Sequence, residues 1–150
     1  MLLKPEAVRA LSGVTSKKRL MNELGTLAET AYGVSHSSAV DALLERERLG
    51  PTGVGHGVAL PHARLDGLDH VVGALVLLDK PIDFKAVDRQ PVDIVFGLFA
   101  PVESGVEHLK ALALVSRTMR DQALCARLRS NHDPGMLHMI VTEAQAAQAA

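Results

Sequence analysis

Hydrophobic residues recur at helical spacing in two segments near the amino terminus. Between Ser16 and Gly33 they fall on one face, at Leu20, Leu24, Leu27, Ala28 and Ala31. This spacing predicts a helix that is buried on that face, with the serine as its amino-terminal cap and the glycine as its stop. A second helix is predicted from a cap at Ser37 or Ser38 to a stop at Gly50-Pro51.

Two runs in the middle of the chain are almost wholly apolar. Their sequences are 71-VVGALVLL-78 and 92-VDIVFGLF-99, which are rich in β-branched residues and too short for most helices. Such runs are typical of buried strands when turn-forming residues bound them. A shorter strand is expected to end at His62, after a glycine-rich loop.

Signals for helix starts return in the last third of the chain. Ser104 and Glu107 have the spacing of a capping box, in which the two side chains bond backbone N–H groups at the start of a helix. Asp121 and Asp133-Pro134 offer two further starts. The alanine- and glutamine-rich tail from about residue 144 is expected to fray.

The order of these elements predicts the fold class. Helices, then strands, then helices indicate one α/β domain over residues 1–150, because no repeat or linker divides the chain. A chain of this length can bury a core without disulfides or a structural metal. We expect a three-layer sandwich, in which a small mixed β-sheet is flanked by helices on both faces.

Composition and charge exclude several functions. The 16 basic and 17 acidic side chains nearly balance, so no strong field of one sign favours nucleic acid or an anionic membrane. The chain shows no signal-peptide pattern and no apolar stretch of roughly 18 residues. The single cysteine, Cys125, is interpreted as a core residue in a helix. We expect a cytoplasmic protein without nucleic-acid partners or membrane insertion.

The stretch 51-PTGVGHGVALPHARLDGLDH-70 needs an explanation of its own. A phosphate-binding P-loop would continue into Gly-Lys-Ser or Gly-Lys-Thr, and a dinucleotide fingerprint would follow a strand and open a helix. Neither pattern is met, and His56 and His62 lack the spacing of a zinc site, so no metal or other cofactor is expected. The remaining interpretation is a docking surface that another molecule approaches closely. Its predicted residues are Gly53, Gly55, Val58 and Arg64.

His62 is the candidate nucleophile. Pro61 stiffens the backbone before it, which limits where the ring can point. If one ring nitrogen donates to a backbone carbonyl, the other keeps a lone pair for an electrophile, and phosphorus suits it best. Arg46, Arg48 and Arg64 are near enough in sequence to balance a phosphoryl charge. Taken alone, however, a histidine at a strand end is more often structural.

His108 is the second candidate. The capping box places it in the first turn of a helix, where free N–H groups and the helix dipole favour an anion. Its ring could then donate to a phosphoryl oxygen, although a first-turn histidine is usually a surface residue. The other histidines are interpreted as structural or as exposed loop residues: His36, His56, His70, His132 and His138.

Several motifs together resemble the IIA domains of the bacterial phosphoenolpyruvate-dependent phosphotransferase system, of the fructose, mannitol and nitrogen-regulatory class. The resemblance covers most of the chain and is carried by Arg46-Glu47-Arg48-Leu49-Gly50, Thr52-Gly53-Val54-Gly55, Val58-Ala59-Leu60-Pro61-His62, Pro81-Ile82-Asp83-Phe84, Asp88-Arg89-Gln90-Pro91-Val92-Asp93, Pro101 and His108-Leu109-Lys110-Ala111-Leu112. Relatives often continue with Gly-Lys or Gly-Ala after the Pro-His pair, whereas Ala63-Arg64 stands here and keeps a positive charge.

The resemblance implies a sheet flanked by helices and a role for each candidate residue. His62 is expected to accept a phosphoryl group from a histidine phosphocarrier protein, with His108 assisting and Arg46 contacting the phosphate. A free-standing chain of this length is similar to the nitrogen-regulatory branch, which implies signalling through protein contacts, with kinases or potassium transporters as conceivable targets. The alternatives are a sugar-uptake component that passes phosphate to a IIB cysteine, and a binding module that never turns over phosphate.

Overall fold

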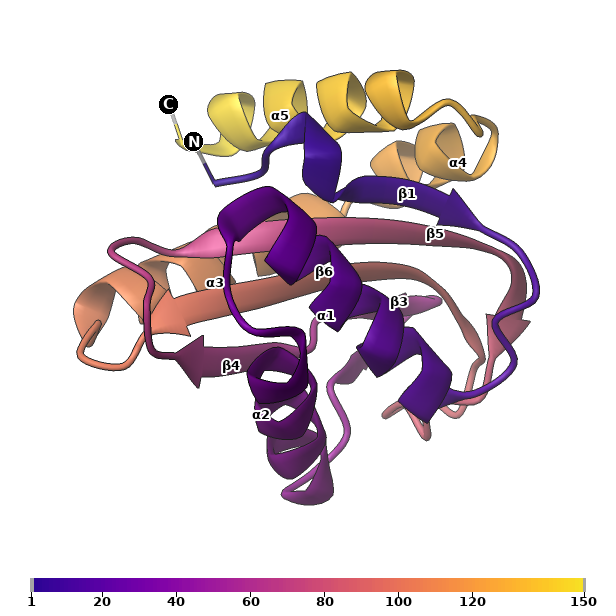
Figure 1. The fold of residues 1–150 in the computed structure, drawn as a ribbon. Helices are drawn as coiled ribbons and strands as arrows, with labels where there is room; N and C mark the ends of the chain where they lie inside the picture. Colours follow the sequence, from indigo (N-terminus) through magenta and orange to yellow (C-terminus); the bar gives the residue numbers. More distant parts are fainter. Residues whose placement is uncertain (1, 150) are drawn as a thin grey trace.

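A mixed sheet of six strands forms the centre of the molecule, as the computed structural model of residues 2–149 shows (Figure 1). Strands β5 and β6 are antiparallel, whereas β1 runs parallel to β5, and both β3 and β4 run parallel to β6. The short strand β2 pairs with β3 at one edge. The bounds are β1 (Val8–Leu11), β2 (Gly53–Gly55), β3 (Val58–Ala59), β4 (His62–Leu65), β5 (Val72–Ile82) and β6 (Val92–Pro101).

Helices cover both faces of this sheet, so the predicted three-layer α/β sandwich is confirmed. Helix α1 packs on α2 and β5, whereas α5 packs on α3, α4 and β1. In Figure 1, α1 lies in front of the sheet and α3 lies behind it. The bounds are η1 (Pro5–Ala7, a 3-10 turn), α1 (Lys17–Tyr32), α2 (His36–Arg48), α3 (Val106–Met119), α4 (Gln122–Arg129) and α5 (Pro134–Ala149).

The sequence predicted both ends of α1 correctly but placed the start of α2 too late. Helix α1 has the predicted cap at Ser16 and ends at Gly33, whose φ of 73° is left-handed. Helix α2 starts earlier than predicted, because the side chain of Ser35 accepts the backbone N–H of Ser38. Ser35 has extended backbone angles, whereas Ser37 and Ser38 already lie in the helix and cannot serve as caps.

Two predictions for the carboxy-terminal half are corrected. Helix α3 begins after Gly105, and the hydroxyl of Ser104 donates to the carbonyl of Pro101 at 2.8 Å, so it caps no helix and the capping box does not form. The tail from about residue 144 continues as part of α5 through Ala149 instead of fraying. Gln145 is buried there, because one face of the tail packs against the core.

Cys125 is a buried core residue, as predicted. Its side chain is 3% exposed, and its Sγ lies 3.3 Å from the carbonyl oxygen of Met119. Burial raises the pKa of the thiol, which keeps it protonated and unreactive. Asp121 caps helix α4, which carries Cys125, also as predicted.

Gly53 offers a test of packing at the edge of the sheet. A Cβ atom at this position would lie 2.7 Å from the Cβ of Ala86 and 3.0 Å from its Cα. We expect Gly53→Ala to lower the free energy of unfolding by about 1–3 kcal/mol, because the backbone at Ala86 has to move. Urea denaturation measures this. Gly135→Ala is the control, since its Cβ would meet Asp133 at an ordinary 3.4 Å; equal losses in both variants would contradict the steric explanation.

Candidate functional site

The segment that carries His62 runs along β6 and is broken at Pro61. Strand β3 pairs Val58 with Ile94, and β4 pairs His62 with Leu98, so the register is the same on both sides of the break. The carbonyl of Pro61 still accepts the N–H of Leu98 at 2.9 Å. His62 therefore begins a strand and does not end one as predicted, because a proline without an N–H interrupts the ladder just before it.

Two hydrogen bonds determine the orientation of the His62 ring. Its Nδ1 lies 3.0 Å from the carbonyl oxygen of Leu60, and its Nε2 lies 3.3 Å from Nε of Arg46. A carbonyl only accepts and the Arg46 guanidinium only donates, so Nδ1 carries the proton and Nε2 keeps its lone pair. The ring is half-buried. The geometry thus leaves one nucleophilic nitrogen beside a positive charge.

Arg46 stands in the last turn of α2 and is itself held in place. Its Nη1 donates to the carbonyl of Gly50 at 2.8 Å, just after the end of the helix. This bond leaves Nε directed at His62, and within residues 2–149 the other N–H groups of the guanidinium have no protein partner that would compete with an incoming anion. The structure therefore brings together two residues that are 16 positions apart in the sequence.

His108, the third residue of α3, lies next to His62. The two ring centroids are 5.6 Å apart, with the ring planes at 63°. The side chain is 6% exposed, and its Nδ1 has no hydrogen-bond partner among residues 2–149. Burial lowers the pKa of this histidine, with smaller contributions from the positive charge of Arg64 and from His62, so the ring is neutral at pH 7. An unpaired buried nitrogen is uncommon, which points to a role beyond packing.

A cavity of about 510 Å³ opens between these side chains and is partly apolar. Arg64 lines it and is anchored through Nη1 to the carbonyls of Ser104 at 2.7 Å and Val102 at 3.4 Å. Leu49 and Leu109 also line it, although their side chains are 81% and 64% exposed. Large exposed leucines beside a polar centre are typical of a surface that a partner covers.

The predicted docking residues do not share one surface. Arg64 lines the cavity at His62, but Val58 is 1% exposed and Gly53 packs against the loop at Ala86. Gly55 has a φ of 104° and is also buried, so it serves the turn of the β2–β3 hairpin. Gly53, Gly55 and Val58 are therefore buried in the free chain, and their part in docking stays a prediction.

The exposed surface at the cavity is formed by Leu49 and Leu109, which the analysis of the sequence missed. Leu49 follows the last helical residue of α2, and Leu109 directly follows His108. Both are large apolar residues beside predicted site residues. Their apolar character next to predicted site residues was the one signal in the sequence, and it does not show that their side chains are exposed.

Comparison with known proteins identifies the family. Residues 1–144 match the family described as "Phosphoenolpyruvate-dependent sugar phosphotransferase system, EIIA 2". The chain belongs to this EIIA 2 family. A nitrogen regulatory protein of Bradyrhizobium diazoefficiens is 42% identical over 140 residues, covering 93% of this chain and 92% of the relative.

A solved structure and a more distant relative extend the comparison. The crystal structure of nitrogen regulatory protein IIA-Ntr from Neisseria meningitidis superposes with a TM-score of 0.85 at 33% identity, covering 93% of this chain and 96% of that one. A fructose-specific EIIA component of Haloferax volcanii is 36% identical over 91 residues, which is 61% of this chain and 59% of the relative. The chain is thus similar both to proteins named nitrogen regulatory and to one named fructose-specific.

Other histidines of this EIIA 2 protein have structural surroundings. Nε2 of His36 lies 3.2 Å from the carbonyl of Asn22, and Nε2 of His138 lies 2.8 Å from the carbonyl of Leu3. His70 is exposed and pairs with the neighbouring carboxylate of Asp69. The backbone contacts of His36 and His138 agree with the structural interpretation, which stays a prediction for His70.

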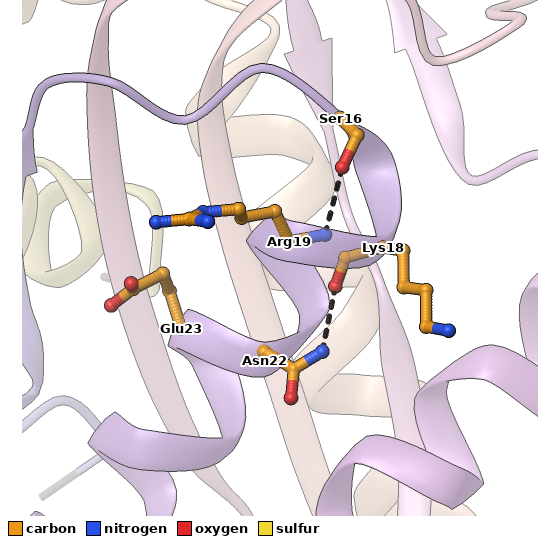
Figure 2. Close-up of a pocket in the computed structure, with 5 residues that line it drawn as sticks. All are labelled: Ser16, Lys18, Arg19, Asn22 and Glu23. Atoms are coloured by element: carbon orange, nitrogen blue, oxygen red, sulfur yellow. Dashed lines mark hydrogen bonds between the residues drawn. The ribbon is translucent and has the colours of Figure 1, made fainter.

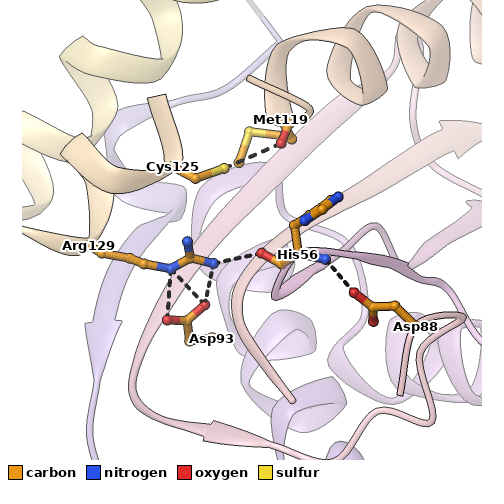
Figure 3. Close-up of polar contacts among 6 residues, drawn as sticks. All are labelled: His56, Asp88, Asp93, Met119, Cys125 and Arg129. Carbon is orange, nitrogen blue, oxygen red and sulfur yellow. Dashed lines mark hydrogen bonds and ion pairs between the residues drawn. The ribbon is translucent and has the colours of Figure 1, made fainter. Parts of the chain in front are cut away.

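His56 contributes its backbone to a clamp on the hairpin that leads to His62 (Figure 3). Its N–H donates to Asp88 at 2.8 Å, and its carbonyl accepts from Arg129 at 2.9 Å. Arg129 also binds both carboxylate oxygens of Asp93. The backbone N–H of His56, and then that of Gln90, lower the pKa of Asp88. The clamp stabilises the left-handed conformation of His56, whose φ is 56°.

A second cavity of about 360 Å³ lies at the start of α1 and shares no residue with the cavity at His62 (Figure 2). Two hydrogen bonds join its lining residues to one another: Ser16 accepts the N–H of Arg19, and Asn22 donates to the carbonyl of Lys18. We assign no chemistry to this cavity. Over residues 2–149, no cluster of three or more His, Cys, Asp or Glu side chains could hold a metal ion, and no helix could cross a membrane.

The lowered pKa of His108 predicts that acid destabilises this EIIA 2 protein. Between the ordinary value of 6.5 and the lower folded value, the unfolded chain binds more protons, so the free energy of unfolding falls as the pH falls through this window. His108→Gln removes this contribution. We expect its thermal midpoint to fall less than that of the wild type between about pH 7.5 and about pH 5. Parallel pH profiles for the two proteins would contradict the assignment.

Proposed function

We propose that His62 accepts a phosphoryl group on Nε2 from the phosphohistidine of a small histidine phosphocarrier protein. The observation that carries the proposal is the hydrogen bond from Nδ1 to Leu60, which leaves the Nε2 lone pair facing Arg46 and the cavity. In the transfer, the bond between phosphorus and the donor ring breaks as the bond to Nε2 forms. The electron pair of the broken bond returns to the donor ring.

Two neighbouring residues would stabilise the transferred group. Arg46 supplies a fixed positive charge beside Nε2, and charge-assisted hydrogen bonds from a guanidinium suit phosphoryl oxygens. The neutral His108 would donate to a phosphoryl oxygen from the first turn of α3, where the helix dipole also favours an anion. Both groups stand beside His62 before the phosphoryl group arrives, and Nε–H of Arg46 has to turn from the Nε2 lone pair to a phosphoryl oxygen as the new bond forms.

The phosphocarrier would dock over the cavity and not on the glycine hairpin. Leu49 and Leu109 present exposed apolar side chains at the cavity that His62 lines, and Arg64 adds a positive charge. The carrier must leave after each transfer, so we expect a transient interface of under about 1,200 Å².

We further propose a regulatory role in the cytoplasm, in which phosphorylation of His62 changes the binding of target proteins such as kinases or potassium transporters. The similarity to nitrogen regulatory proteins supports this role. A sugar-specific role, with transfer from His62 to a IIB cysteine, is the second candidate, because a fructose-specific EIIA component also matches part of the chain.

The test is reconstitution of the transfer with phosphoenolpyruvate, enzyme I and a histidine phosphocarrier. The protein should gain one phosphoryl group that acid removes, as a phosphoramidate requires. Label that survives acid, or no label at all, would contradict the proposal. A fructose-type IIB protein added afterwards separates the two roles: label retained on the chain supports regulation, and rapid passage to the IIB cysteine supports sugar uptake.

A further inference from the structure

Glu47 lies where two helices meet the loop before β2. Its side chain is only 6% exposed, and its Oε2 pairs with Nζ of Lys17 at 2.7 Å. The same oxygen accepts the backbone N–H of Thr52 at 3.1 Å, and Oε1 accepts the Thr52 hydroxyl at 2.6 Å. One buried carboxylate therefore ties the loop at residues 49–52 to both α1 and α2.

This loop also anchors the two residues that meet at the reactive nitrogen. The carbonyl of Gly50 holds Nη1 of Arg46. The carbonyl of Thr52 accepts the N–H of Leu60 at 2.9 Å, and the carbonyl of Leu60 accepts Nδ1–H of His62. Two short chains of hydrogen bonds thus lead from the loop, one to the guanidinium and the other to the imidazole.

We propose that Glu47 and Thr52 are positioning residues for phosphoryl transfer at His62, an inference that rests on the function proposed above. Neither side chain contacts the ring. They hold the loop where Gly50 can orient Arg46, and where Leu60 can select the Nδ1–H form of His62.

The physical reason is the narrow geometry of the transfer. A nucleophile has to be aligned with the phosphorus, and a displacement of about 1 Å can cost on the order of 10² in rate. The His62 ring has the further requirement that Nε2 be unprotonated. If Leu60 moves away, Nδ1–H loses its acceptor and the proton can occupy Nε2, which removes the lone pair that attacks.

Thr52→Val tests the inference, because valine keeps the shape of this buried side chain and removes the hydroxyl that Glu47 binds. We expect single-turnover transfer at saturating carrier to slow by about 10-fold, with the half-saturating carrier concentration unchanged. The ¹⁵N signals of the unphosphorylated His62 ring should shift from the Nδ1–H tautomer toward a mixture of both. Thr52→Ser, which restores a hydroxyl, should recover the rate and the signals.

Thr118→Val is the matched control. Thr118 is also buried, and its hydroxyl donates to the carbonyl of Leu114 at 2.8 Å inside α3, outside the loop at residues 49–52. This variant should leave the rate and the His62 signals at wild-type values. Glu47→Gln is a second variant that should shift the ring signals in the same direction as Thr52→Val, since it weakens the bond to Lys17.

Unchanged ring signals in both Thr52→Val and Glu47→Gln would overturn the inference, whatever the rate. An equal effect of Thr118→Val would also overturn it, because any lost buried hydrogen bond would then suffice. The signals are read on the unphosphorylated protein, so they decide the positioning of His62 separately from phosphorylation. A wild-type protein that takes no label would instead overturn the proposed function.

Discussion

Replacing His62 with glutamine is expected to abolish acceptance of the phosphoryl group. Glutamine keeps a polar side chain at the start of β4, but an amide nitrogen is no nucleophile. The ring is half-exposed and makes two hydrogen bonds at the surface of the fold, so the thermal midpoint should stay near the wild-type value. The measurement is the amount of acid-labile label taken from the phosphorylated carrier, after circular dichroism has shown that the variant is folded.

His70→Gln is the control for this result, because His70 is exposed and, among residues 2–149, its side chain forms a hydrogen bond only with its neighbour Asp69. It should take label at the wild-type rate. A folded His62→Gln protein that still takes label at this rate would show that another residue is the acceptor, and the assignment of His62 would be wrong.

Removal of His108 is expected to slow the transfer by a factor on the order of 10² to 10³, which is the scale for deleting one preorganised donor. The attacking ring of His62 stays in place in His108→Ala, so the variant should still be phosphorylated, although slowly. His108→Gln retains a donor at a similar reach and should recover part of the loss. Single-turnover transfer from the phosphorylated carrier measures both rates.

Two outcomes would contradict the division of roles between the histidines. If His108→Ala accepts phosphate as fast as the wild type, the buried ring serves only the fold, despite its unpaired Nδ1. If His108→Ala is folded but takes no label at all, the roles of nucleophile and helper have been exchanged. The loss of stability caused by the space that alanine leaves is separated from the loss of the donor by comparing the thermal midpoints of the alanine and glutamine variants.

Elements encoded by neighbouring residues were predictable. The cap at Ser16, the left-handed stop at Gly33 and the start at Asp121 each depend on a few adjacent positions. The two apolar runs became β5 and β6 because β-branched residues buried on both sides favour strands. Strand β1 was not predicted, since its four residues acquire their strand conformation by pairing with β5, far along the chain.

In the candidate site, too, the residue types were predictable from the sequence and the contacts between distant residues were not. The sequence named His62, His108 and Arg46, but no local pattern could show that Arg46 donates to Nε2 while Leu60 holds Nδ1. The sequence also could not show that Val58 is buried, because its burial depends on its pairing with β6.

The sequence by itself determined the periodicity of the helices, the apolar strands, the chemical types of the reactive side chains and the resemblance to the EIIA 2 family. Only the tertiary structure decided which ring nitrogen of His62 is free, which leucines line the cavity, and that Glu47 holds the loop behind both Arg46 and His62. The physical reason is range: caps and periodicity act within one or two helical turns, whereas hydrogen-bond partners and burial are decided by residues that folding brings together.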